Sequence, residues 1–241
     1  MKKYIITLSL ASFLFLGCTE LQQIASQLPH ETSQGIGGIS NAKIGNGLKQ
    51  ALEFGVQDGV EKLSKKDGFW ADQATRILLP QELKNVENTL RNFGLGSLAD
   101  EGIKLLNRAA EDAVIEAAPI FKNAIMSMTF DDAKGILLGS DNAATQYLKN
   151  KTSQQLFNAF EPKVENSLGK VGADKIWEQI FTNYNRLTGQ NINTNLNAYV
   201  TEQAIGSVFN MVQEKEIGIR NNIGLRTTPL LKEVFALQDR K

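Results

Sequence analysis

Apolar residues recur every three or four positions through most of this chain. In the stretch from Leu48 to Leu63 they fall on one face of an α-helix, and similar stripes run through residues 83–90 and 103–128. No segment of useful length alternates apolar with polar residues, as a half-buried strand would. The pattern therefore predicts an all-α fold, a single compact bundle of about eight to ten helices in residues 47–241.

Local signals mark where several of these helices should begin. A threonine followed three places later by an acid or amide, as in residues 129–132 and 152–155, has the spacing of a capping box. Thr228-Pro229 combines a capping residue with a proline suited to the first turn. Pro119 should bend or restart the helix that it interrupts. We expect helix boundaries at these four points.

The first residues have the organisation of a secretory signal peptide. Lys2-Lys3 is followed by an apolar run from Tyr4 to Leu16 and then by Gly17-Cys18. The alternative is an uncleaved membrane anchor, but the run is shorter than the roughly 20 residues that a spanning helix needs. A cysteine directly after a small residue resembles the lipobox of bacterial lipoproteins. This resemblance implies cleavage after residue 17 and acylation of Cys18.

Residues 18–46 are predicted to be a flexible tether. They contain four glycines in the segment from Gly35 to Gly45 and little apolar periodicity, although the spacing of Leu21, Ile24 and Leu28 also allows a short helix. A flexible chain of this length spans on the order of 30 Å. The expected organisation is a signal peptide (1–17), an acylated Cys18 with its tether (18–46) and a helical domain (47–241).

Composition excludes several kinds of chemistry. The chain has 26 basic and 26 acidic residues, so it lacks the excess positive charge that nucleic acids and anionic lipids attract. Cys18 is the only cysteine and His30, in the tether, is the only histidine. The helical domain can therefore hold neither a disulfide, nor a histidine- or cysteine-based zinc site, nor a histidine-dependent catalytic triad. We predict no cofactor, no metal ligand and no nucleic-acid partner.

Two acidic pairs have a structural and a chemical interpretation. Glu111-Asp112 and Asp131-Asp132 could bind a cation or exchange protons. The simpler interpretation places Asp131-Asp132 in the first turn of a helix, where negative charge is favourable, and Glu111 in a helix-surface pair with Arg108.

A series of short motifs resembles the bacterial domain-of-unknown-function family 4197. The motifs include Asn107-Arg108-Ala109-Ala110-Glu111, Met128-Thr129-Phe130-Asp131-Asp132-Ala133, Ala143-Ala144-Thr145-Gln146-Tyr147, Tyr199-Val200-Thr201, Ile219-Arg220 and the segment from Arg226 to Phe235. The resemblance implies an envelope protein, commonly a lipoprotein, and implies no activity. The polar residues on its motif positions are candidates for one shared cluster: Arg108, Glu111, Asp131, Asp132, Thr145, Arg220 and Arg226. We expect Arg220 and Arg226 to pair across the bundle with these carboxylates.

Together these observations predict a lipid-anchored envelope protein that binds a partner protein or an apolar ligand in a groove between helices. The lipid on Cys18 would hold it to the membrane. Thr19 follows the cysteine, where aspartate is the usual inner-membrane retention signal of bacterial lipoproteins, and by that resemblance we expect the outer membrane. We also expect the protein to face the periplasm. The alternative is a hydrolase of an envelope polymer that uses Asp, Glu and Arg. A cleft in which Asp131 or Asp132 meets Arg220 or Arg226 would favour that alternative.

Overall fold

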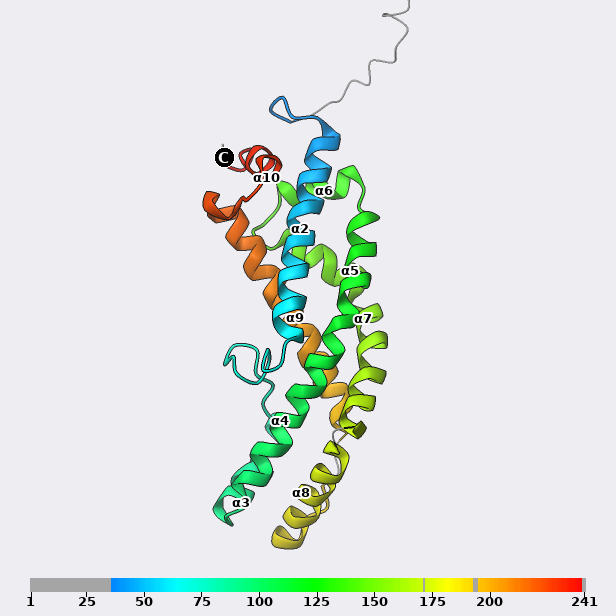
Figure 1. The fold of residues 1–241 in the computed structure, drawn as a ribbon, viewed down its shortest axis with the longest axis vertical. Coiled ribbons are helices and arrows are strands. Elements are labelled where there is room, and N and C mark those ends of the chain that lie inside the picture. Colours follow the sequence, from blue (N-terminus) through cyan, green and yellow to red (C-terminus); the bar gives the residue numbers. More distant parts are fainter. Residues whose placement is uncertain (1–35, 171, 193–194, 240–241) are drawn as a thin grey trace, which may run out of the picture. The chain divides into compact units, whose positions relative to one another are not determined.

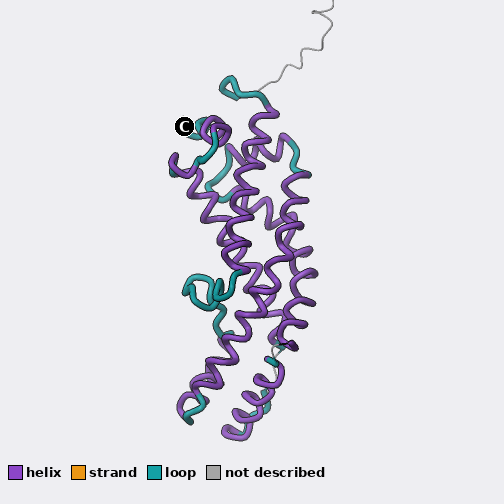
Figure 2. Tube along the Cα trace, viewed as in Figure 1, coloured by secondary structure: helices purple, strands orange, loops and turns teal. Residues whose placement is uncertain are grey.

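The computed structural model describes residues 36–170, 172–192 and 195–239, which belong to the second of the two units of the chain, residues 35–241. Within these residues every regular element is a helix, and one isolated β-bridge joins Ile36 to Ile39 (Figures 1 and 2). The prediction of an all-α bundle is confirmed. The elements are α2 (Asn41–Ser64), η1 (Gln81–Leu83), α3 (Lys84–Asn92), α4 (Gly96–Ala113), η2 (Val114–Glu116), α5 (Ala117–Met126), α6 (Phe130–Leu137), α7 (Ala143–Lys170), α8 (Ala173–Thr188), α9 (Leu196–Asn221), η3 (Ile223–Leu225) and α10 (Pro229–Phe235).

The first described helix begins earlier than the apolar pattern predicts. Helix α2 starts at Asn41, because the Ser40 side chain caps it by accepting a hydrogen bond from the Lys43 backbone N–H at 3.4 Å. Ile44 is fully buried, so residues that we assigned to the tether contribute to the core. Gly45 and Gly47, which follow Ile44, dilute the apolar stripe, which is why the pattern missed this turn.

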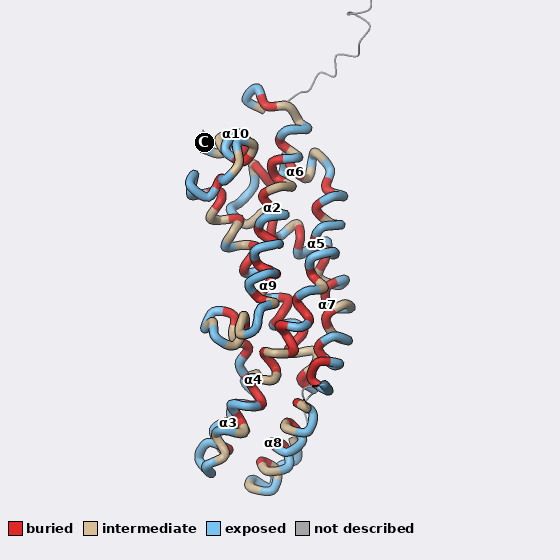
Figure 3. The backbone as a smooth tube through the Cα atoms, in the orientation of Figure 1, coloured by how far each residue is buried: buried red, intermediate tan, exposed pale blue. Residues whose placement is uncertain are grey.

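The core lies between α2, α4, α7 and α9, with α5, α6 and α10 packed around them. Buried segments of these helices face one another, and their outer sides are exposed (Figure 3). Two glycines allow close contacts of α2: a Cβ built at Gly47 would lie 2.6 Å from Val234, and one at Gly59 would lie 3.1 Å from Met211. Helix α10, near the end of the chain, therefore packs directly on the N-terminal part of α2.

Three of the four predicted boundaries are confirmed. Thr129 and Asp132 form a complete capping box at the start of α6, and Thr228 caps α10 with Pro229 in its first turn. Pro119 lies in the first turn of α5, which a 3₁₀ segment separates from α4. The boundary at Thr152 is wrong. Thr152 is buried inside α7 and its hydroxyl donates to the Leu148 carbonyl at 2.7 Å, so the helix continues through it.

No helix among the described residues has both the length and the apolar character needed to cross a membrane. Cys18, the signal peptide and residues 18–35 of the predicted tether lie outside the described residues.

Candidate functional site

A buried carboxylate of α9, Glu216, caps the N-terminus of α7. It accepts hydrogen bonds from the backbone N–H groups of Ala144 and Thr145, both at 2.8 Å, and from the Thr145 hydroxyl at 2.7 Å. Arg220, one turn later on α9, donates to the same carboxylate from Nε at 3.1 Å and from Nη2 at 2.8 Å. Because the first N–H groups of a helix lack partners and carry positive partial charge, Glu216 both satisfies and neutralises this helix end.

Arg220 joins the same cluster to the end of α6. Its guanidinium donates to the Ile136 carbonyl at 2.9 Å and to the Leu137 carbonyl at 3.3 Å, and its side chain is 2% exposed. The Glu216–Arg220 pair thus bridges the last carbonyls of α6 and the first N–H groups of α7. We call this set, Ile136, Leu137, Ala144, Thr145, Glu216 and Arg220, the α9 cluster.

Arg226 closes the end of α9 itself. It donates from Nε to the Ile219 carbonyl at 3.0 Å and from Nη2 to the Arg220 carbonyl at 2.9 Å. Its remaining donors reach the two oxygens of Asp239 at 2.5 and 2.8 Å, and its guanidinium lies 5.8 Å from the centre of the Phe235 ring. This arginine therefore fixes the segment after α10 against the C-terminus of α9.

A second cluster lies on α4 and holds residues 65–80. Glu111 is 4% exposed and accepts hydrogen bonds from the Phe69 and Trp70 backbone N–H groups at 3.2 and 3.5 Å. Its other oxygen pairs with Arg108 at 2.6 Å, and Arg108 reaches Asp67 at 2.5 Å. Asp67 has a φ of 70°, a left-handed conformation in which a non-glycine residue is strained. The ion pair compensates for part of that strain.

Asn107, one turn before Glu111, completes what we call the α4 cluster. Its amide oxygen accepts from the Ile77 N–H and its amide nitrogen donates to the Ile77 carbonyl, both at 2.8 Å. The side chain is fully buried, and its two hydrogen bonds pair with the Ile77 backbone as those of a neighbouring β-strand would. Residues 65–80 are thus fastened to α4 at two points.

The candidate residues do not form the single cluster that we expected. Arg108 and Glu111 belong to the α4 cluster, and Thr145 and Arg220 to the α9 cluster. Arg226 pairs with Asp239. The predicted pairing of Arg220 and Arg226 with Asp131, Asp132 or Glu111 is wrong, because Asp131 is exposed and Asp132 is occupied by its capping box with Thr129.

Sequence reasoning also missed four partners, Asp67, Asn107, Glu216 and Asp239. The four-residue spacing of Glu216 and Arg220 on one helix face was an available signal. Nothing in the sequence indicated that Glu216 would also cap a helix formed by residues far upstream.

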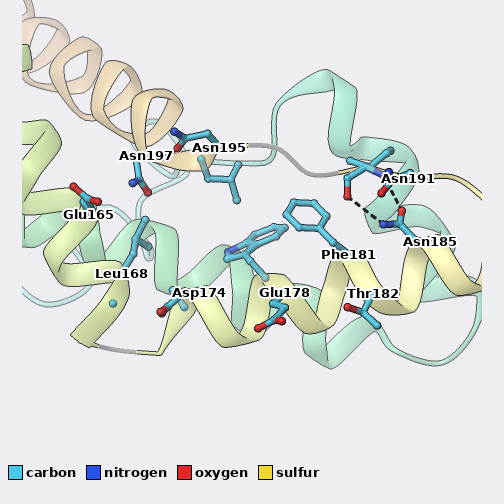
Figure 4. Close-up of a pocket in the computed structure, with 15 residues that line it drawn as sticks. Glu165, Leu168, Asp174, Glu178, Phe181, Thr182, Asn185, Asn191, Asn195 and Asn197 are labelled. Carbon is cyan, nitrogen blue, oxygen red and sulfur yellow. Dashed lines mark hydrogen bonds between the residues drawn. The ribbon is translucent and has the colours of Figure 1, made fainter.

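A groove of about 790 Å³ lies between the end of α7, helix α8 and the start of α9, and we call it the α8 groove (Figure 4). In Figure 4 Leu168 and Phe181 extend from their helices into it, whereas Asp174 and Glu178 lie along the side of α8. Its apolar floor comprises Leu168, Trp177, Phe181, Ile192 and Leu196, and its carboxylates are Glu165, Asp174 and Glu178. Neither lysine nor arginine is among the described residues that line it.

Asn185 of α8 shapes one end of this groove. Its side-chain oxygen accepts from the Ile192 N–H at 2.9 Å and its amide nitrogen donates to the Ile192 carbonyl at 3.2 Å, as the dashed lines in Figure 4 show. Trp177 and Phe181 pack at 5.7 Å with their planes tilted by 42°. Among the described residues the Trp177 indole N–H, which is buried, has no hydrogen-bond partner. This N–H is therefore an unsatisfied donor beneath the groove, because the adjoining edge of the indole packs against Gly102 of α4.

The part of the chain that matches a known protein family is nearly the same as the described domain. Residues 38–236 match the family described as protein of unknown function, DUF4197. The chain belongs to the DUF4197 family. No curated protein and no solved structure matches it. The resemblance inferred from the short motifs is thereby confirmed, and the match begins close to the structural start of α2.

The motif positions of this DUF4197 protein act mainly as supports. In the described residues, Glu111, Arg220 and Arg226 all bond to backbone groups or to an opposite charge. No group of three or more His, Cys, Asp or Glu side chains in the described ranges could hold a metal ion. The α8 groove, in contrast, has charged groups without such partners.

The pairing of Asp239 with Arg226 predicts how the stability of the DUF4197 domain changes at acidic pH. The hydrogen-bonded Arg226 guanidinium lowers the pKa of the Asp239 carboxyl below its ordinary value of 3.8. A carboxyl whose pKa is lower in the folded state stabilises that state at neutral pH, and the stabilisation disappears as pH falls through the folded-state pKa. The stability lost in Asp239→Asn should therefore shrink below pH 3.8. Urea unfolding of both proteins between pH 7 and pH 2.5 measures this, and a constant difference would contradict it.

Proposed function

We propose that this DUF4197 protein is a lipid-anchored, non-enzymatic binding module of the bacterial cell envelope, and that the α8 groove holds its ligand. The lining of the groove is the observation that supports the proposal. An apolar floor with carboxylates at its side fits an amphiphilic organic cation, whose apolar body covers the floor and whose charged group meets the carboxylates. The volume of about 790 Å³ lies in the range of small-molecule sites.

The sign of the ligand charge follows from the carboxylates. Glu165, Asp174 and Glu178 have no ion pair or side-chain hydrogen bond within the part of the chain that the structure describes. Asp174 and Glu178 lie one turn apart on α8, so they repel each other weakly. A cation close to both would reduce that repulsion and gain Coulomb energy, which salt would screen because the groove is open to water.

The aromatic residues favour the same class of ligand. The rings of Trp177 and Phe181 pack together in the groove, and the negative face of an aromatic ring attracts organic cations.

The hydrolase alternative gains no support from the geometry. It required a cleft in which Asp131 or Asp132 meets Arg220 or Arg226. Instead Arg220 and Arg226 are buried and bonded to Glu216 and Asp239.

Octyltrimethylammonium is a suitable probe, because it combines an apolar chain with a permanent charge. We expect it to bind more tightly than octanol, and its affinity to fall with rising salt. Replacing Asp174 by Asn together with Glu178 by Gln should weaken its binding about tenfold, equivalent to about 1.4 kcal/mol. Titration calorimetry at two salt concentrations provides the measurement.

The matched control removes two exposed carboxylates outside the groove, with Asp131→Asn and Glu214→Gln. That variant should bind the probe as the natural chain does. Equal affinity for octanol and octyltrimethylammonium would contradict the charge argument. No binding of either probe at millimolar concentration would overturn the proposed ligand class.

The lipid anchor is tested separately, because Cys18 lies outside the described residues. The lipobox-like Phe15-Leu16-Gly17-Cys18 supports acylation. Cys18→Ser should abolish labelling by a palmitate analogue and move the protein out of membrane fractions, or leave the uncleaved precursor. A mutant that still labels and still sediments in the mature form would refute the anchor, and density fractionation tests the outer-membrane location.

A further inference from the structure

A second groove, which we call the α7–α9 groove, lies between the middle sections of α7 and α9. It has a volume of about 410 Å³, and its lining runs from Thr145 to Phe157 on one helix and from Glu202 to Gln213 on the other. Stretches of this length correspond to about three helical turns, or roughly 17 Å along the helices. The groove is therefore long enough for a short chain-like ligand.

The charges of this groove balance, unlike those of the α8 groove. Among the described residues that line it, Lys149 is the only base and Glu202 the only acid. Neither has an ion-pair partner in the part of the chain that the structure describes. The groove therefore favours neither a cation nor an anion, and a neutral ligand avoids the cost of desolvating a charge without a counter-charge.

Side-chain amides are the largest group in the polar lining, and one of them, Gln154, donates to the Asn158 side chain at 2.9 Å. Gln146, Asn210 and Gln213 line the groove, and within the described residues their side chains have no hydrogen-bond partner. Each amide offers both donors and acceptors. A hydroxyl group likewise donates and accepts, so a ligand rich in hydroxyls can pair with every amide in either orientation.

The floor exposes too little apolar surface for an amphipathic helix. Ile205 and Phe209 are buried, with only 9% and 6% of their surface exposed, and Phe157 is half-buried. Like the floor of the α8 groove, these side chains leave a small apolar area that a small ligand can cover. That area would add little to the docking of a whole helix face, because hydrophobic stabilisation is proportional to the apolar area removed from water. These side chains are instead suited to the small C–H faces of a polar ring.

Gly206 keeps the middle of the groove open. It is exposed inside α9, has an ordinary helical φ, and a Cβ built on it would have no neighbour within 4 Å. Glycine inside a helix is less stable than alanine by about 1 kcal/mol. Packing against the bundle explains Gly47 and Gly59 but not Gly206. A side chain at position 206 would occupy the space that a ligand needs.

We propose that the α7–α9 groove binds a neutral oligosaccharide, with its hydroxyl groups bonded to the amides and a ring face on Phe157. This site is independent of the cation site in the α8 groove, and neither inference requires the other. It assigns a second ligand class, hydroxyl-rich uncharged chains, to the same domain.

Chemical-shift mapping with two neutral tetrasaccharides, chitotetraose carrying N-acetyl groups and maltotetraose, tests the proposal. We expect at least one of them to shift the amide resonances of the two helix sections. Gly206→Leu should weaken binding at least tenfold, because the leucine side chain fills the centre of the groove. Its melting temperature should not fall, because leucine is the better helix former.

The matched control is Gly135→Leu, since Gly135 is also an exposed helical glycine without a neighbour near its missing Cβ, but lies outside this groove. This variant should bind the sugar as the natural chain does. If Gly206→Leu does not fold, Gln146→Ala combined with Gln213→Ala replaces it, with the same expected loss. Octyltrimethylammonium binding should be unchanged in all these variants.

Two results would overturn the proposal: no binding of either tetrasaccharide at millimolar concentration, or full affinity in the Gly206→Leu variant. Tetrasaccharide binding that persists in Gly206→Leu and disappears in the Asp174→Asn, Glu178→Gln variant would place the sugar in the α8 groove instead. If only the cation probe fails to bind, the proposal of a sugar site is unaffected.

Discussion

Replacing Arg220 by alanine should lower the free energy of unfolding by about 3–5 kcal/mol, as expected when one partner of a buried ion pair is removed. Glu216 would stay buried without its counter-charge, and the carbonyls of Ile136 and Leu137 would lose donors in a place that water does not reach. Chemical denaturation followed by circular dichroism measures the change. A loss below about 1 kcal/mol would mean that Arg220 is an ordinary surface arginine in solution.

A double substitution of the same pair tests whether Glu216 acts as a helix cap or only as one half of an ion pair. A buried ion pair can often be replaced by two apolar residues without loss. Here Glu216→Met with Arg220→Met should still destabilise the fold, because the Ala144 and Thr145 N–H groups would remain unsatisfied. The matched surface control is Lys65→Ala, which removes an exposed pair with Glu61 on α2 and should cost no more than about 1 kcal/mol.

Replacing Glu111 by alanine should have the second large effect, again about 3–5 kcal/mol, because Glu111 is a buried partner of Arg108. The loss should be concentrated in residues 65–80, whose Phe69 and Trp70 N–H groups would lose their acceptor. We therefore expect faster hydrogen exchange and new proteolytic cleavage in this segment before the bundle unfolds.

Glu111→Gln provides the conservative comparison. The amide retains an oxygen for the backbone N–H groups but loses the charge that pairs with Arg108, so its loss should be smaller than that of alanine. Equal losses would show that the charge dominates. Unchanged hydrogen exchange in residues 65–80 of the alanine variant would show that Glu111 does not hold this segment.

The fold was predictable because its helices have a regular apolar periodicity. The pairing of residues far apart in the sequence was not predictable. The helix stripes, the Thr129 capping box and the Thr228-Pro229 start all depend on residues within one or two turns, so the sequence contains the whole signal. Glu216 and Thr145 are separated by 71 residues, and their contact exists only after α7 and α9 have packed. No local rule could identify Glu216 as the cap of α7.

The errors have the same physical origin. Thr152-Gln155 has the local spacing of a helix start, but Leu148 and Leu156 are both fully buried, and this continuous apolar stripe outweighs the cap. The family resemblance predicted which residues belong to the motifs. It did not predict which residues they pair with. Burial of Arg220 and Arg226 was correctly predicted, but their partners Glu216 and Asp239 lie outside the quoted motifs.

The contact between the two ends of the domain affects how it folds during synthesis. Helix α2, the first described helix to be made, meets α10 through Gly47 and Val234 and through the Lys43–Glu233 ion pair at 2.6 Å. A nascent chain therefore cannot complete this contact until α10 has been translated. Such sequence-distant closure slows folding. The domain should accordingly remain incompletely folded until α10 has been synthesised.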